Sequence, residues 1–367
     1  MHKTSNISIR VFNGILVSLS IATTLLLSSI TPAQAKDKQL VTEDFKIDST
    51  VSGIKLFMRN KHLKGQIDKV GDRTLLYVHG ATYPSETAFD LPIEGVSMMD
   101  LLAQQGFNVY LVDIRGYGGS TRPEEMSVPG QNNKPIVHTE DAVADFGSAV
   151  DYILNKNKLK KINIMGWSWG TSITGMYTST HNDKVNRLVL YAPLWLYKSD
   201  TAMPAPPTNP GDSPNGIGAY RLVSKDSAKG RWLKGVAPEQ IPSLIPPGVY
   251  ESWAEKTWAT DPQAATSGSL RAPNGVLDDI KNYWMAGKPM YDANNIRVPT
   301  LMLHAEWDAD LPSYQAQAMF AEMKSAPYKR LVELSEGTHT VMLEKNRMQF
   351  FRELNLFLSE KNPQALK

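Results

Sequence analysis

Short apolar runs that recur between helical patterns are the feature that most constrains the fold of this chain. Each run is nearly continuous, which is typical of a strand buried on both faces of a parallel sheet. The runs are Leu75–Val78, Val109–Val112, Ile162–Met165, Leu188–Leu190 and Leu301–Leu303. The clearest helical pattern starts at Thr139, its predicted N-cap, with apolar residues at spacings of three and four. Strands that alternate with helices predict an α/β fold, with a mostly parallel central sheet and helices on both faces.

Two regions depart from this alternation. Near the start, polar and apolar residues alternate through 45–47 and 54–58, which predicts two antiparallel strands. Residues 194–296 contain five of the eight tryptophans and no buried-strand run, and the alternation resumes at Val298. We therefore predict one core domain formed by residues 36–193 and 297–367, with residues 194–296 inserted as a cap.

The first 35 residues have the pattern of an export signal. Lys3 and Arg10 form a basic start, Val11–Ile30 carries no charge, and Thr31–Ala35 ends in an A-x-A cleavage site. Cleavage after Ala35 predicts an exported protein, in a bacterial periplasm or secreted. The alternative is an uncleaved membrane anchor, because an apolar run of about 20 residues is long enough to span a bilayer.

Composition excludes several classes of function. The chain is 42% hydrophobic and 21% charged, which is too apolar for intrinsic disorder. Without Lys3 and Arg10, basic and acidic residues are equal in number, so we expect no nucleic-acid partner and, after signal cleavage, no membrane partner. The absence of cysteine excludes disulfides, thiolate nucleophiles and cysteine-ligated zinc. No other ligand cluster is present, so we predict no metal and no cofactor.

A candidate nucleophile follows the run that ends at Met165. Gly166–Gly170 reads G-W-S-W-G and precedes a helix-compatible segment, giving the order strand, G-x-S-x-G, helix. A serine on so sharp a turn projects its hydroxyl above the sheet, and the flanking glycines let strand and helix approach closely. We take Ser168 as the candidate nucleophile. The alternative is an idle serine in a glycine-rich turn.

A serine hydroxyl becomes a good nucleophile only when a base accepts its proton. Among the seven histidines, His339 lies in a loop after an apolar run, where a strand of such a sheet presents functional groups. The alternative is an ordinary surface-loop histidine. The orienting acid should lie between serine and histidine in chain order. We favour Asp308, which would hold the imidazole tautomer, with Asp310 and Glu306 as rivals.

At this point the residues resemble the α/β-hydrolase fold family over nearly all of the chain after the leader. His79–Thr82 resembles the family's H-G-x-x turn, and Asp113–Ser120 resembles its D-x-R-G-x-G-x-S segment. The resemblance implies an α/β-hydrolase fold with an inserted cap. It also implies that the backbone N–H groups of Ala81 and Trp169 form an oxyanion hole. Val298–Pro312 is similar to the family's acid-bearing strand, with Asp308 aligned to the catalytic acid.

Branches of the family can be compared at the same positions. Haloalkane dehalogenases and epoxide hydrolases carry aspartate where Ser168 stands, whereas prolyl iminopeptidases resemble the chain in Gly-x-Ser-Trp-Gly and in Asp113–Pro123. We expect an exported serine esterase that acts on a small-molecule ester, apolar or aromatic, with lactones and xenobiotics among the candidates. A prolyl-iminopeptidase-like aminopeptidase or amidase is the alternative, and a non-catalytic binding protein is a third class.

Tryptophans near the nucleophile and in the insertion are candidates for an apolar substrate pocket. We select Trp167 and Trp195 as substrate-binding residues. The alternative is that most tryptophans only pack the cap onto the sheet. The oligomeric state is left open by the sequence.

Overall fold

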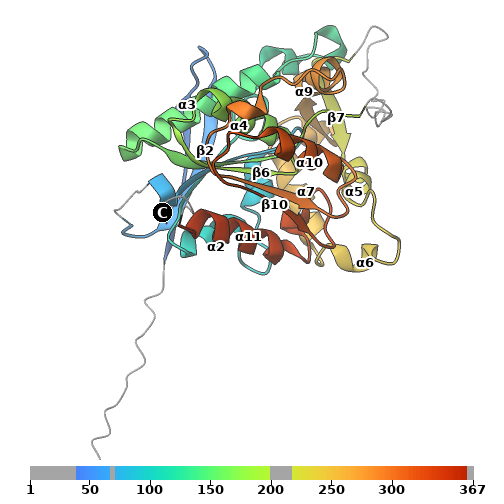
Figure 1. Cartoon of the computed structure of the whole chain (residues 1–367). Coiled ribbons are helices and arrows are strands. Elements are labelled where there is room, and N and C mark those ends of the chain that lie inside the picture. Colours follow the sequence, from blue (N-terminus) through green and yellow to red (C-terminus); the bar gives the residue numbers. More distant parts are fainter. Residues whose placement is uncertain (1–38, 67–70, 199–216, 362–367) are drawn as a thin grey trace, which may run out of the picture. The chain divides into compact units, whose positions relative to one another are not determined.

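An eight-stranded sheet forms the centre of the fold, with the order β1-β2-β4-β3-β5-β6-β9-β10 (Figure 1). The structure is a computed structural model that describes residues 39–66, 71–198 and 217–361. The predicted signal sequence, residues 1–35, therefore lies outside the described residues. Lys38–Lys367 forms one compact unit. Among the helices described, none combines the length and apolar character needed to cross a membrane.

The strands of the sheet are β1 (Leu40–Asp48), β2 (Lys55–Leu63), β3 (Thr74–Val78), β4 (Asn108–Val112), β5 (Ile162–Trp167), β6 (Val185–Tyr191), β9 (Thr300–Ala305) and β10 (Lys329–Leu334). β2 pairs antiparallel with β1 and β4, and every other pairing in the sheet is parallel. Every residue of β3, β4, β5 and β9 is buried. The predicted buried strands and the predicted antiparallel start are both confirmed.

The helices are α1 (Ser85–Phe89), α2 (Met98–Gln104), α3 (Thr139–Asn157), α4 (Trp169–Thr180), α5 (Lys225–Trp232), α6 (Ile241–Leu244), α7 (Val249–Ala259), α8 (Ala264–Ser267), α9 (Gly275–Asp279), α10 (Ser313–Glu322) and α11 (Arg347–Ser359). α3 and α4 cover one face of the sheet, and α2 and α11 cover the other (Figure 1). This layering confirms the predicted α/β fold with helices on both faces.

The start of α3 corrects one detail of the sequence analysis. The N-cap is His138 rather than Thr139, because the His138 N–H donates to the Asp141 carboxylate at 3.0 Å. Thr139 is the first helical residue. Its hydroxyl donates to Asp279 Oδ2 at 2.7 Å, which ties the start of α3 to α9.

The segment between β6 and β9 contains α5–α9 and a separate two-stranded antiparallel sheet, β7 (Tyr220–Ser224) with β8 (Ser269–Pro273). The sequence of this segment contains no buried-strand run. In β7 four of the five residues are at least partly exposed, whereas β8 is mostly buried but is interrupted by Arg271. We call the described residues 217–296 the insertion. Whether it matches the predicted cap boundaries stays a prediction.

The parallel strands bring their carboxyl ends to one edge of the sheet. Val78 at the end of β3 is in register with Gly166, Trp167 with Tyr191, and Ala305 with Leu334. The loops that follow β3, β5, β9 and β10 therefore meet at this edge, as is general for ligand sites of α/β sheets.

Candidate active site

Ser168 lies at the sharp turn between β5 and α4 with φ 57° and ψ −121°. This backbone conformation is rare for a residue with a side chain, and such strain concentrates at functional sites. A Cβ at Gly166 would lie 2.1 Å from the Gly170 carbonyl oxygen, and a Cβ at Gly170 would lie 2.7 Å from that of His79. Only glycine fits at both flanking positions, so the G-x-S-x-G spacing is what allows this turn.

His339 and Asp308 are joined by a short hydrogen bond. His339 Nδ1 lies 2.7 Å from Asp308 Oδ2, and the Asp308 side chain is fully buried. The Trp167 indole N–H and the Tyr191 hydroxyl both donate to the His339 carbonyl oxygen, at 3.0 and 2.7 Å. Asp308 Oδ1 accepts the backbone N–H of Leu311 at 2.9 Å. Neighbouring residues thus hold the backbone of His339 and the side chain of Asp308, in addition to the bond between the two side chains.

The two rival acids have other partners. Asp310 Oδ2 accepts from Arg231 Nε at 2.6 Å, and Glu306 Oε2 accepts the backbone N–H of Glu336 at 2.8 Å. Of the three acids in this loop, Asp308 is the one bonded to the His339 ring.

The carboxylates around His339 raise the pKa of its imidazole ring. Burial acts to lower the pKa of His339, but the charges of Asp308 and Asp310 outweigh it, so the pKa is raised above its ordinary value. Burial acts to raise the pKa of Asp310, but the Arg231 guanidinium outweighs it and the pKa is lowered. Asp310 is therefore an ionised partner of Arg231 near neutral pH.

The loop after β3 passes directly over the candidate nucleophile. A Cβ at Gly80 would lie 3.0 Å from the Ser168 Cβ. Burial lowers the pKa of His79 to about 4, so this ring is neutral. Its Nε2 accepts the Ile114 N–H at 3.1 Å, and its Nδ1 therefore donates to the Gly80 carbonyl oxygen at 2.6 Å. His79 thus fixes the loop rather than taking part in proton transfer.

Two backbone donors remain free beside Ser168. Within residues 39–66, 71–198 and 217–361, the N–H groups of Ala81 and Trp169 donate to no protein acceptor. Trp169 is the first residue of α4, where backbone N–H groups have no partner inside the helix. The structure therefore brings both predicted oxyanion donors close to the candidate nucleophile.

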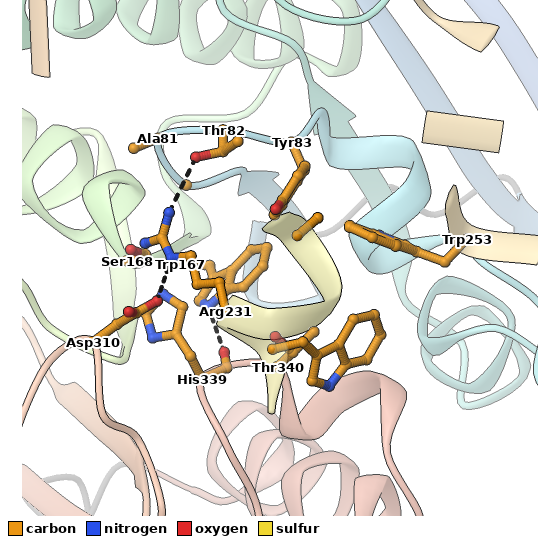
Figure 2. A pocket seen from close by; sticks show the side chains of 13 residues that line it. Ala81, Thr82, Tyr83, Trp167, Ser168, Arg231, Trp253, Asp310, His339 and Thr340 are labelled. Atoms are coloured by element: carbon orange, nitrogen blue, oxygen red, sulfur yellow. Dashed lines mark hydrogen bonds and ion pairs between the residues drawn. The ribbon is translucent and has the colours of Figure 1, made fainter. Parts of the chain in front are cut away.

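Ser168 opens onto two hollows. The first, which we call the small pocket, has a volume of about 30 Å³ and is lined by Ser168, His339 and Asp310 together with Trp167, Trp232 and Trp253. Figure 2 shows these side chains, with dashed lines from Arg231 to Asp310 and to Thr82. The second, the large cavity, has a volume of about 450 Å³ and reaches from Ser168 between the core and the insertion.

The two predicted substrate tryptophans lie in different places. Trp167 lines the small pocket, as expected. Trp195 is fully buried, packs against Trp284 and Tyr291 at ring distances of 5.3 Å, and lines neither hollow. Its role here is packing, and the prediction that it contacts substrate is not supported by its position.

Sequence reasoning missed a buried carboxylate behind the histidine loop. Glu344 accepts the backbone N–H of Thr338 at 2.9 Å, the hydroxyl of Thr338, and the indole N–H of Trp232 at 2.8 Å. Burial raises the pKa of Glu344 to about 7. This residue therefore links the loop that carries His339 to helix α5 of the insertion. No motif marks it, and its partner in the insertion, Trp232, is 112 positions away in sequence.

Arg221 and Arg231 were also missed. Arg231 lines both hollows, and Arg221 lines the large cavity. Both come from the insertion, where the sequence offered tryptophan content as its main signal. In the part of the chain that the structure describes, no group of three or more histidine, aspartate or glutamate side chains could hold a metal ion.

Comparisons with known proteins agree with this geometry. Lipase member N of Mus musculus is 24% identical over 147 residues, which are 40% of this chain and 37% of that protein. A serine hydrolase of the polyaromatic hydrocarbon-degrading bacterium Cycloclasticus zankles has a similar structure, with a TM-score of 0.56, 17% identity, and coverage of 86% of this chain and 98% of that one. A thermophilic esterase of Thermogutta terrifontis matches with a TM-score of 0.52, 18% identity, and coverage of 87% and 100%.

A family model described as alpha/beta hydrolase fold matches residues 73–346, which is well over half of the 367 residues. The matched region runs from the start of β3 to the start of α11 and includes every candidate residue of the site. The chain therefore belongs to the alpha/beta hydrolase fold family.

Proposed function

We propose that this protein is a serine hydrolase of carboxylic esters that works through an acyl-enzyme. The observation that carries the proposal is the 2.7 Å bond between His339 and Asp308 in a pocket that Ser168 also lines. The bond occupies Nδ1 of the imidazole and leaves Nε2 to exchange protons with the serine and the substrate.

In the proposed reaction, Ser168 attacks the ester carbonyl while His339 accepts the hydroxyl proton. Asp308 keeps the Nδ1 proton in place and stabilises the imidazolium. The N–H groups of Ala81 and Trp169 bind the oxygen on which negative charge develops. His339 then returns the proton to the leaving alcohol, and water completes the second half of the cycle by the same route.

The ester is favoured over the peptide substrate by the charges in the small pocket. An aminopeptidase needs a free carboxylate to bind the α-ammonium group of its substrate. Asp310 is the one acid that lines the small pocket among the residues the structure describes, and Arg231 already neutralises it. The similar proteins, which are a lipase, an esterase and a serine hydrolase, support the same choice. Amidase or aminopeptidase activity remains the second candidate.

Ser168→Ala tests the proposal, with a p-nitrophenyl acyl ester as substrate and proline p-nitroanilide as the peptidase probe. Loss of the nucleophile should lower kcat on the order of a millionfold, by analogy with another serine hydrolase. Ser172→Ala is a matched control, because Ser172 is buried in helix α4, which follows Ser168, and its hydroxyl has no hydrogen-bond partner among the described residues. A fluorophosphonate should label Ser168 alone. Hydrolysis that survives in Ser168→Ala contradicts the proposal.

Export is a separate proposal that rests on the leader. If residues 1–35 are removed in the cell, N-terminal sequencing of the protein from the periplasm or medium should begin at Lys36. A cell-associated protein that retains Met1 would support the membrane-anchor alternative instead.

A further inference from the structure

Arg221, in strand β7 of the insertion, is a buried cation without an acidic partner. The residue is 5% exposed. Its hydrogen bonds come from Nη1 and Nη2 and go to the Ala81 and Pro273 carbonyl oxygens at 2.7 Å and to other neutral acceptors. No carboxylate of the described ranges lies within 4.0 Å of it. A buried charge is normally paired with an opposite charge, whereas both Nη groups here bond only neutral acceptors, so the positive charge is not balanced by a carboxylate of the described residues.

The large cavity that Arg221 lines carries a net positive charge. Among the described residues, four charged side chains line it, which are Arg221, Arg231, Lys234 and Asp310. Arg231 and Asp310 form an ion pair, so their charges cancel. Lys234 is exposed and makes no ion pair within the described part of the chain. Arg221 and Lys234 therefore line the cavity as cations without an ion-pair partner among the described residues.

Apolar side chains form much of the remaining wall. They include Leu194, Leu222, Val223, Val276, Leu277 and Ile280. A volume of about 450 Å³ lies within the range of small-molecule sites. The cavity thus combines apolar wall residues with cationic side chains, which suits an apolar chain that carries an anionic group.

The position of His339 tells which half of an ester enters which hollow. The leaving oxygen must receive its proton from His339, so the alcohol has to lie beside that ring. His339 lines the small pocket but not the large cavity. The acyl chain therefore extends into the large cavity, and a hollow of about 30 Å³ limits the alcohol to a small group.

We infer that the preferred substrate is an ester of a small alcohol with an apolar acid whose far end carries a second, anionic group that Arg221 and Lys234 bind. This inference rests on the proposed ester hydrolase activity and names its substrate class.

Two methyl esters of the same length test the inference. One is monomethyl suberate, which ends in a carboxylate, and the other is its terminal amide, which has the same shape without the charge. Methanol release by the full enzyme should give a kcat/KM about tenfold to a hundredfold higher for the carboxylate, the range of a hydrogen bond to a charged group. The preference should weaken at high salt because Lys234 is exposed.

The variants compare the ratio of the two rates within each protein, so a general loss of activity does not affect the result. Arg221→Gln should bring the ratio close to one. Lys234→Ala should lower it a few-fold without disturbing the buried loop that Arg221 supports. Lys225→Ala is the matched control, since this exposed lysine on α5 lines neither hollow and should keep the wild-type ratio.

The two proposals fail in different ways. Equal rates on both esters by an active wild-type enzyme, or a ratio unchanged in both Arg221→Gln and Lys234→Ala, would overturn the anionic-acyl inference alone. Hydrolysis of both esters by Ser168→Ala would overturn the ester hydrolase proposal itself.

Discussion

The candidate site has two sides that are built differently. On the sheet side, the backbone and buried side chains hold Ser168, Asp308 and His339, and the His339 side chain is 12% exposed. On the insertion side, Arg231 extends from α5 with 45% of its side chain exposed, and a few contacts such as Trp232 to Glu344 attach the helix to the core. If the proposed function is correct, the sheet side would supply the chemistry and the insertion side the selectivity.

The largest expected effect comes from neutralising two neighbouring acids one at a time. Asp308→Asn should lower kcat about ten-thousandfold, because the imidazole then loses its correct tautomer. Asp310→Asn should change kcat by less than about tenfold, since its partner Arg231 is partly exposed. Steady-state rates on one p-nitrophenyl ester decide between them. A larger loss in Asp310→Asn would make Asp310 the orienting acid in place of Asp308.

The stability of the insertion can be tested through its own buried ion pair. Asp261 has a fully buried side chain and accepts from the guanidinium and the backbone N–H of Arg271. Asp261→Asn leaves that cation underpaired and should lower the free energy of unfolding by about 3 kcal/mol. Urea unfolding measures this free energy. The control is Asp48→Asn, which removes an exposed ion pair with Lys55 and should change the free energy of unfolding by less than about 1 kcal/mol. Equal effects would mean that the insertion contributes nothing of its own.

The pH profile probes how far the insertion side influences the base. Neutral His339 accepts the proton, so kcat/KM should fall about tenfold per pH unit below its pKa. Because Asp308 and Asp310 raise that pKa, the acidic limb should lie above pH ~6.5, the ordinary value for histidine. Asp310→Asn removes one of the two carboxylates and should move the limb to lower pH. A limb that does not move would show that Arg231 fully screens Asp310.

The smallest expected effect concerns the contact that joins the two sides. Trp232→Phe removes the indole donor to Glu344 and should cost about 1 kcal/mol in stability, with KM changing more than kcat. Trp258→Phe is the control, because its indole N–H is buried without a partner among the described residues and no bond is lost. If kcat falls in Trp232→Phe as much as KM rises, the insertion also positions His339, and the division between the two sides is incomplete.

Sequence reasoning worked well where the signal is local. Apolar runs predicted the strands because a strand covered on both faces has to be apolar throughout. Gly166 and Gly170 predicted the sharp turn at Ser168 because no other residue fits the close approach. The predicted fold and family are confirmed, and the catalytic roles stay predictions. The same reasoning misjudged Trp195, because tryptophan content does not tell whether a ring faces a cavity or packs in the core.

The sequence by itself determines the order of Ser168, Asp308 and His339 in the chain. Each follows a strand of a parallel sheet, and parallel strands end at the same edge of the sheet, so the three residues lie at that edge. Only the tertiary structure decided which acid meets the imidazole, since three acids within five residues look alike until the loop is folded. It also decided that Arg221 lies buried beside the cavity without an anion. The physical reason is range: backbone periodicity and turn geometry act between near neighbours, whereas the pairing and desolvation of a charge depend on residues that are 31 positions away for His339 and Asp308, and 140 for Arg221 and Ala81.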